Sequence, residues 1–411
     1  MKCNGGLITN YNAIRRKHYL HLISKIIIAA GLLLYTSCKQ STSERDQRTD
    51  SPNIEFSNFS ATIKYAKHFS IKQLNNYKLL VVIDPWRGDT LCSYILHKKG
   101  VSIKNVNVKN ATLIEVPAKT IGCLSTTHVG ALSLLKLQDK IVGVSNGAQV
   151  FDSIVAEGFR SGKIKEIGRQ MNTNMEQIIA LSPDLIMKSG YDNVRNNDER
   201  LHELGLPVAY NIEWMEYNLL ARAEWIKFEA AFFCKDKEAD SIFNAIEQRY
   251  NEALKIAQTV TFRPKVLIGI DYKSSWHLAG EESYVAKMLH DAGANFIANG
   301  KKGSTPLNFE QVLKIHSDDD FWLNFMHQGI TSLEVLEKCN ERYTLFKAFH
   351  NGEVYNHDKR MNPAGGNDFW ESGVSNPDLL LKDLIKIFHP ELLPDYEMVY
   401  WRKLPKTDTP Q

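Results

Sequence analysis

The segment that decides the fold is MEQIIALSPDLIM at residues 175–187, which has a near copy in FEQVLKIHSDDDFWL at residues 309–323. Each copy predicts a short amphipathic helix, a turn and a buried strand. Each also carries a glutamate in the first helical turn, Glu176 in one copy and Glu310 in the other. A unit repeated in this way predicts two similar lobes with a cleft between them.

Short apolar strands alternate with helical patterns around both copies, which is typical of parallel α/β sheets. Residues 215–259 contain no Pro or Gly and have helical spacing, so we expect one long or lightly broken helix to join the lobes. The predicted fold class is α/β, with two Rossmann-like lobes, each a parallel sheet flanked by helices, joined by one long bridging helix, with an N-terminal β extension. The predicted boundaries are signal peptide 1–37, tether 38–56, β extension 57–118, lobe 1 119–211, bridging helix 212–260, lobe 2 261–390 and C-terminal tail 391–411.

The N-terminus has the pattern of an export signal. Arg15, Arg16 and Lys17 precede the apolar run 26–34, and small residues then precede Cys38. A cysteine in this place resembles a bacterial lipobox, which implies cleavage before Cys38 and lipidation of its thiol. An uncleaved anchor helix or ordinary secretion are the alternatives. The polar residues that follow are typical of a flexible tether, so we expect an exported, periplasmic or cell-envelope lipoprotein.

Composition excludes several classes of protein. The 411 residues carry a formal net charge of +3 with acids and bases mixed, which argues against a nucleic-acid-binding surface. Six widely spaced cysteines with no CxxC pair disfavour a zinc site and leave either one disulfide or free thiols open. The sequence lacks Gly-x-Ser-x-Gly, P-loop and His-Glu-x-x-His motifs, so we predict that the protein is not an enzyme.

Four phrases, in the right order, resemble one known family. Residues 129–144, 174–186, 283–294 and 346–355 resemble segments of the helix-bridged (class III) periplasmic substrate-binding proteins, which serve ABC importers for ferric siderophores, haem and cobalamin. The resemblance covers roughly residues 119–390. The phrases at 365–373 and 388–391 resemble a lipoprotein branch of this family found in Bacteroidetes-type bacteria, for which no ligand is defined.

The resemblance implies an ABC permease and ATPase as partners, and a monomer anchored to a membrane through its lipid. In the family, a glutamate in each lobe pairs with arginines of the permease, which assigns docking to Glu176 and Glu310. Helix capping is the alternative. Thr173 with Glu176 fits a capping box, whereas Asn308 with Gln311 caps the second helix without Glu310. Capping therefore explains only Glu176.

Loops after the strands of both lobes are expected to line the cleft. They offer aromatic, amide and cationic side chains that suit a planar or carboxylated ligand: His128, Ser145, Tyr191, Tyr272, Trp276, His327, Arg360, Asn367 and Trp370. The turn at residues 84–87 is a further candidate for the rim of the cleft. Each aromatic residue also suits a core position, which is the alternative. Trp276, Arg360 and Trp370 are the first residues to test by mutation.

No metal site and no cofactor are predicted, because the spacing of the histidines and tyrosines supports no preformed site. His128, His277 and His327 offer ligands for haem iron or corrin cobalt, but a chelate can carry its own iron or cobalt. The alternative function is an interaction or scaffold lipoprotein that keeps the fold without an importer. A relative of the nitrogenase-like α/β enzymes would need cluster cysteines that the chain lacks.

Overall fold

The computed structural model describes residues 61–101, 108, 111–169, 172–190, 198–324 and 329–407. The chain divides into two compact units, Met1–Ile54 and Glu55–Gln411, and the first lies wholly outside the described residues. The signal peptide, the lipidation site Cys38 and the tether therefore stay predictions. Within the described residues, no helix is both long and apolar enough to cross a membrane.

The N-terminal extension is one four-stranded sheet in the order β1-β2-β3-β4. Its strands are β1 (Phe69–Leu74), β2 (Tyr77–Ile83), β3 (Thr90–Lys98) and β4 (Ala111–Val116). The first three strands run antiparallel and β4 joins β3 in parallel. In β2 every second residue is buried, including Leu80 and Val82, so one face of the sheet is free to pack against the rest of the protein.

Lobe 1 is built on a five-stranded parallel sheet in the order β11-β10-β5-β6-β7. Its strands are β5 (Ile121–Cys123), β6 (Ile141–Val144), β7 (Lys165–Glu166), β10 (Leu185–Ser189) and β11 (Val208–Asn211), with a small hairpin of β8 (Gly168–Arg169) and β9 (Asn172–Thr173). Its helices are α2 (Thr126–Leu134), η1 (Gln138–Lys140), η2 (Gly147–Gln149), α3 (Ser153–Arg160), α4 (Met175–Leu181) and α5 (Glu199–Glu203). Because β5 and β10 are neighbours without being consecutive, the strand order reverses beside β5, where folds of this kind place ligands.

Lobe 2 has a main sheet in the order β12-β16-β17-β18 and a smaller antiparallel sheet of β13, β14 and β15. The strands are β12 (Val266–Ile268), β13 (Asp271–Tyr272), β14 (Ser275–Ala279), β15 (Ser304–Leu307), β16 (Phe321–Asn324), β17 (Val354–Asn356) and β18 (Arg402–Lys403). The helices are α9 (Tyr284–Asp291), α10 (Phe309–His316), α11 (Leu333–Cys339), η5 (Glu341–Leu345), α12 (Lys347–His350), α13 (Asp368–Ser375), α14 (Pro377–Phe388) and η6 (Pro390–Leu392). In the main sheet β12, β16 and β17 are parallel, and the C-terminal β18 adds an antiparallel edge.

These sheets confirm the predicted α/β class with two lobes and a β extension. The bridge between the lobes differs from a single helix. It consists of η4 (Glu213–Met215), α6 (Leu219–Glu224), α7 (Ile226–Ala231) and α8 (Asp236–Ala257). The chain breaks before α6, where Asn218 caps that helix, and again before α8, where Cys234 adopts a left-handed φ of 56°. Phe228, Phe232 and Phe233, which precede the second break, are all buried in the core.

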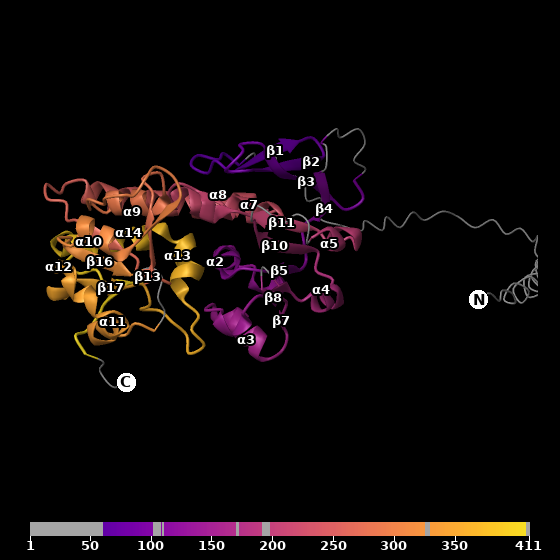
Figure 1. The fold of residues 1–411 in the computed structure, drawn as a ribbon. Coiled ribbons are helices and arrows are strands. Elements are labelled where there is room, and N and C mark those ends of the chain that lie inside the picture. Colours follow the sequence, from indigo (N-terminus) through magenta and orange to yellow (C-terminus); the bar gives the residue numbers. More distant parts are fainter. Residues whose placement is uncertain are drawn as a thin grey trace, which may run out of the picture. The chain divides into compact units, whose positions relative to one another are not determined.

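The bridge still joins the two cores. Ala239 and Phe243 of α8 pack in the core shared by lobe 1 and the extension, while Tyr250 and Ala253, farther along the same helix, pack in the core of lobe 2. In Figure 1 the indigo strands of the extension lie along α7 and α8, on the side away from the lobe 1 sheet. Phe69 of β1 contacts the ring of Trp225 with centroids 4.7 Å apart, so the extension packs directly on the bridge.

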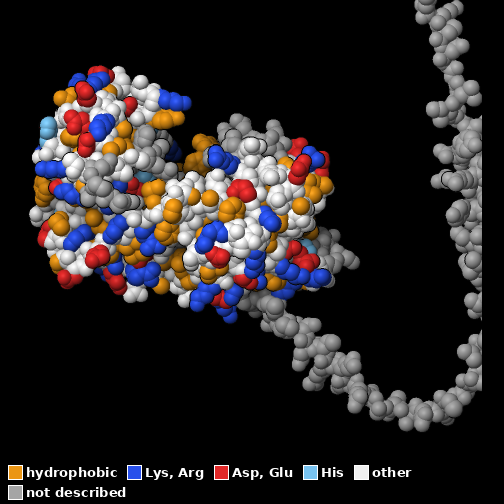
Figure 2. Space-filling model, turned by 90° about the horizontal axis from the view of Figure 1, so that it is seen from below, with side chains coloured by type: hydrophobic (Ala, Val, Ile, Leu, Met, Phe, Trp, Pro, Cys, Tyr) orange, Lys and Arg blue, Asp and Glu red, His pale blue; other side chains and the backbone are white. Residues whose placement is uncertain are grey.

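Charged side chains of both signs are interspersed on the face shown in Figure 2, in keeping with the small net charge of the sequence. Cys92, Cys123, Cys234 and Cys339, the cysteines that the described residues include, are free thiols. The tail predicted at residues 391–411 contains the strand β18 at Arg402–Lys403, and Trp401 just before it is buried in the core.

Candidate ligand-binding site

A cavity of about 790 Å³ opens where the extension, the bridge and lobe 2 meet. The turn between β2 and β3 and the segment that begins at η4 form one part of its wall, and β12 to β14, the start of α9, the loop before β15 and α13 form the rest. The wall is rich in aromatic side chains: Trp86, Trp214, Tyr217, Tyr272, Tyr284 and Trp370. Acidic and basic side chains also line it: Glu216, His277, Glu282 and Lys302. A mostly apolar cavity with a few polar groups is the usual form of a small-molecule site.

A tight hairpin presents Tyr272 to this cavity. β13 and β14 are joined by Lys273 and Ser274, both with positive φ (51° and 63°), which is the backbone of a type I′ turn. The side chain of Lys273 lies 5.1 Å from the centre of the Tyr272 ring. Tyr272 remains 59% exposed, which leaves its ring available to a ligand.

A buried ion pair supports the wall from behind. The Nε of Arg222 donates to Glu213 at 2.7 Å, and the Arg222 guanidinium lies 4.5 Å from the centre of the Tyr284 ring. Burial acts to lower the pKa of Arg222, but Glu213 and Tyr284 outweigh that effect and leave the pKa raised. The guanidinium therefore stays charged and holds Tyr284 in place at the cavity.

Glu216 links the cavity to the N-terminal side of the extension. Its carboxylate accepts hydrogen bonds from the backbone N–H of Lys67 (3.1 Å) and His68 (3.0 Å) and from the indole N–H of Trp225 (3.0 Å). Burial raises the pKa of Glu216 above its usual value, and these three donors oppose the rise. The lining of the cavity is thus fixed to the residues that precede β1.

Two of the predicted ligand-binding residues, Tyr272 and Trp370, line the cavity, together with His277 and with Pro85 and Trp86 from the turn at 84–87. The sequence interpretation missed the run from Trp214 to Tyr217, which was assigned to the start of the bridging helix. Asn218 could have indicated that a helix begins after it, because Asn is a common N-cap residue. In the structure its side chain caps α6 by accepting from the backbone N–H of Ala221 at 2.8 Å. A helix that starts there leaves the preceding residues free to form a wall.

Two predicted ligand-binding residues are core residues instead. Trp276 is 0% exposed, donates its indole N–H to the Ile268 carbonyl at 2.8 Å and packs against Trp322. His128 on α2 is also fully buried, and neither of its ring nitrogens has a hydrogen-bond partner within the described residues. Burial lowers the pKa of His128 to about 3, so the ring is neutral and is out of reach of a ligand in the cavity.

Ser145, Arg360 and Asn367 do not line the cavity either. Ser145 is buried after β6, with its N–H bonded to the Cys123 carbonyl at 2.9 Å. Asn367 caps α13, accepting from the N–H of Phe369 at 3.0 Å. Arg360 is held by Asp368 at 2.6 Å and lies over the Phe151 ring. These polar groups serve contacts within the protein.

Arg360 of lobe 2, which lies over Phe151 of lobe 1, belongs to a direct contact between the lobes. The amide nitrogen of Asn362 donates to the carbonyls of Ala148 (3.1 Å) and Val150 (3.0 Å), and the Glu371 carboxylate accepts from the N–H groups of Phe151 (2.7 Å) and Asp152 (2.6 Å). Here α13 lies so close to α2 that a Cβ on Gly130 would come within 2.2 Å of the Glu371 carbonyl. The two lobes therefore touch directly beside the bridge as well as being joined by it.

Tyr191 and His327 lie outside the described residues, so their predicted roles stay predictions. Across the residues that the structure describes, no three His, Cys, Asp or Glu side chains gather in a way that could hold a metal ion.

The two repeat units place their glutamates alike. Glu176 and Glu310 each occupy the second position of a helix, α4 and α10, and each is exposed. The cap of α4 is Asn174 and not Thr173, so the predicted capping role of Glu176 is wrong. The capping box of Asn308 and Gln311 on α10 is present. Capping therefore explains neither glutamate.

The two glutamates differ in their partners. Glu310 accepts from Arg342 at 2.6 Å, and this hydrogen bond is the main cause of the lowered pKa of Glu310. For Glu176 the structure shows no ion pair with any described residue. The sequence predicted a contact within the protein for Glu176 and none for Glu310. The structure shows the reverse, because Glu310 is paired with Arg342 and Glu176 has no ion pair with a described residue.

Comparison with known proteins places this arrangement among solute-binding proteins. Residues 121–361 match the family model described as periplasmic binding protein. An uncharacterized lipoprotein of Methanocaldococcus jannaschii is 26% identical over 361 residues, covering 81% of this chain and 83% of that protein. An uncharacterized ABC transporter substrate-binding lipoprotein of Bacillus subtilis is 22% identical, covering 53% of this chain and 67% of its own length. A periplasmic heme-binding protein of Pseudomonas aeruginosa shares the fold with a TM-score of 0.52 and 17% identity, covering 71% of this chain and all of that one.

Proposed function

Because this chain belongs to the periplasmic binding protein family, we propose that it is the substrate-binding component of an ABC importer, and that it captures a metal chelate such as a ferric siderophore, haem or cobalamin. The family consists of solute-binding proteins, which are not enzymes. The chelate brings its own metal, so the proposal requires no resident cofactor.

The aromatic cavity is the observation that carries this proposal. Its volume of about 790 Å³ lies within the usual range for small-molecule sites, and its wall offers tyrosine and tryptophan rings with few charges. Such a wall gains free energy by covering the conjugated or apolar surface of a chelate. His277 and Lys302 supply donors for peripheral carboxylates or amides of the same ligand.

Glu176 and Glu310 are proposed to dock the loaded protein on the permease. Both carboxylates are exposed at the same position of matching helices in the two lobes, and no cap requires them. Two charges held at a fixed separation orient an encounter with a partner that carries two positive groups. The ion pair between Glu310 and Arg342 would then exchange for one with the permease.

The protein is proposed to act at the cell envelope, held by a lipid on Cys38 with residues 38–56 as a tether. The signal-like N-terminus supports this placement, and so do the lipoprotein relatives in Methanocaldococcus jannaschii and Bacillus subtilis. A tethered receptor remains near the importer at a high effective concentration.

Calorimetric titration tests the proposal directly. Residues 61–411, purified without metal chelates, are titrated with haemin, cyanocobalamin and ferrioxamine B. We expect one of the three to bind with a Kd in the micromolar range or below and with 1:1 stoichiometry. If none of these chelates binds, the proposed cargo is wrong and the alternative of a scaffold lipoprotein gains support.

A further inference from the structure

The extension contributes residues to the cavity although it lies outside the part of the chain that the family model matches. That match begins at Ile121, the first residue of β5, whereas Pro85 and Trp86 come from the turn between β2 and β3. The extension thus brings an element to the cavity that the shared family core does not supply.

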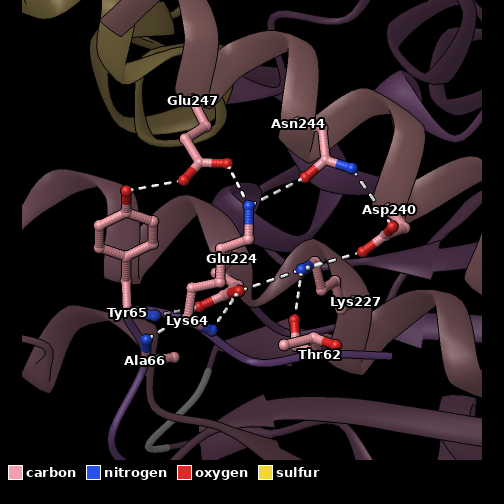
Figure 3. Close-up of polar contacts among 9 residues, drawn as sticks. All are labelled: Thr62, Lys64, Tyr65, Ala66, Glu224, Lys227, Asp240, Asn244 and Glu247. Carbon is pink, nitrogen blue, oxygen red and sulfur yellow. Dashed lines mark hydrogen bonds and ion pairs between the residues drawn. The ribbon is translucent and has the colours of Figure 1, made fainter. Parts of the chain in front are cut away.

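The extension is fixed to the bridge by buried polar contacts, shown in Figure 3. The Glu224 carboxylate of α6 accepts from the N–H groups of Lys64 (2.9 Å), Tyr65 (2.7 Å) and Ala66 (2.9 Å). Lys227 of α7 donates to Glu224 at 3.0 Å and to the Thr62 carbonyl at 2.7 Å. Because Glu224 and Lys227 are fully buried, these contacts hold the residues before β1 in one position on the bridge.

A second buried pair fixes the sheet itself. Lys78 of β2 is bonded to Asp236 at the start of α8, and both side chains are almost completely buried. Tyr94 of β3 packs edge-on against Phe228 and Phe232 of the bridge. The turn between β2 and β3 therefore has a defined position relative to the bridge and to the cavity beside it.

The turn at residues 84–89 is itself locked. Asp84 is buried, and its carboxylate accepts from the N–H groups of Trp86 (2.9 Å) and Arg87 (3.0 Å) and from the Arg87 guanidinium (2.8 Å). The N–H of Gly88 donates to the Asp84 carbonyl at 2.8 Å, and Gly88 adopts a φ of 73° that favours glycine. Burial acts to raise the pKa of Asp84, but these hydrogen bonds and the Arg87 charge lower it overall, so the carboxylate is ionised.

This locked turn exposes a tryptophan at the cavity. Trp86 is 57% exposed, whereas each of the other six tryptophans of the chain is buried or half-buried. An exposed indole on a rigid turn is a pre-organised contact, because binding need not order the backbone that carries it. Tyr272 and Trp370 of lobe 2 line the same cavity.

We propose that the turn at residues 84–89 is a third component of the ligand-binding site, in which the Trp86 ring covers an aromatic or conjugated face of the chelate and selects for ligands that have one. This inference rests on the proposed function, since it assumes that the cavity receives a chelate. It adds that the extension, and not only the bridge and lobe 2, determines which chelate is retained.

The test compares Trp86→Ala with two matched variants. Phe262→Ala removes a 67% exposed aromatic side chain that does not line the cavity, and Trp86→Phe keeps an aromatic ring at the turn. Each protein is titrated by calorimetry with haemin, cyanocobalamin, ferrioxamine B and the planar aromatic anion 8-anilinonaphthalene-1-sulfonate. Thermal unfolding of each variant confirms that the fold is intact.

We expect Trp86→Ala to weaken binding of the conjugated ligands and of the anilinonaphthalene probe about tenfold. This is the effect of losing one ring contact and the apolar burial that goes with it. Phe262→Ala should bind as the unaltered protein does, and Trp86→Phe should recover most of the affinity. Equal affinities of Trp86→Ala and the unaltered protein, for a conjugated probe that binds, would overturn the inference and leave the proposed function standing. Failure of every probe to bind the unaltered protein would overturn both.

Discussion

Glu371 shows how a single residue can make the contact between the lobes depend on pH. Its carboxylate is buried on α13 and accepts two backbone N–H groups of lobe 1. Burial is the main cause that raises the pKa of Glu371 to about 7, and the two hydrogen bonds only partly oppose it. Near neutral pH the group therefore titrates inside the folded protein.

The sign of the pH effect follows from this raised pKa. The unfolded chain has the ordinary glutamate pKa of 4.5, so the contribution of Glu371 to stability is present below that pH and is lost as pH rises through about 7. Between about pH 4.5 and pH 8, the free energy of unfolding should fall relative to that of Glu371→Gln by on the order of 3 kcal/mol. Urea unfolding at several pH values measures the difference. Glu252→Gln, at an exposed position of α8, is the control, and parallel pH curves for Glu371→Gln and the unaltered protein would contradict the prediction.

At the scale of elements, the bridge is a platform as well as a connection. α6 and α7 carry the buried residues Glu224 and Lys227, on which the start of the extension lies. Removing one partner of such a network leaves buried donors without an acceptor. The resulting loss of stability is larger than the net contribution of the whole network.

We expect Glu224→Ala to lower the free energy of unfolding by about 3–5 kcal/mol, because three backbone N–H groups lose their acceptor and Lys227 loses a counter-charge. Glu252→Ala, on the exposed face of α8, should change it by less than about 0.5 kcal/mol. Chemical unfolding measures both values, and limited proteolysis should cut the Glu224 variant first near residues 61–68. Equal stabilities of the two variants would show that the extension is held by its apolar face alone.

The elements that sequence predicted well are those with a strong local pattern. Both repeat units form the predicted helix, turn and strand, α4 with β10 and α10 with β16, since their apolar spacing is regular. The bridge was harder, because a run without Pro or Gly gives no stop signal. Its breaks lie at Asn218, which caps α6, and at Cys234, which adopts a left-handed φ of 56°.

The candidate site was predictable only in part, because tryptophan suits both a core and a ligand site. Trp276 and Trp370 were equal candidates in the sequence, yet the first packs against Trp322 in the core and the second lines the cavity. What separates them is tertiary packing, which no local pattern contains. The turn that carries Trp86 could be predicted from its own residues. Its place at the cavity could not, because it depends on how the extension packs on the bridge.

At the scale of the whole molecule, the proposed docking role requires the two exposed glutamates, one in each lobe, to act together. Each sits at the second position of its helix, and the contact of α13 with lobe 1 limits how the lobes move. Such an arrangement suits recognition of a fixed spacing by a permease. Double reversal, Glu176→Lys with Glu310→Lys, should abolish uptake of the chelate while its Kd stays unchanged.

Uptake by cells that express the protein with its importer measures the first quantity, and calorimetry the second. Glu252→Lys is the matched reversal away from both helices and should transport normally. Among single variants, Glu176→Lys should reduce uptake more than Glu310→Lys, since Glu310 already shares its charge with Arg342. Normal uptake by the double variant would rule out docking through these carboxylates.

The strand β18 has a consequence for how the protein is made. It is the last strand of the main sheet of lobe 2 in chain order, and Trp401 beside it is fully buried. A ribosome delivers these residues long after the lobe 1 strands have emerged. Lobe 1 can therefore acquire its structure during synthesis, whereas the main sheet of lobe 2 keeps an open edge until β18 has been synthesised. A message truncated just before codon 401 would yield a chain that lacks β18. Its exposed β17 edge is a feature that quality-control proteases can recognise.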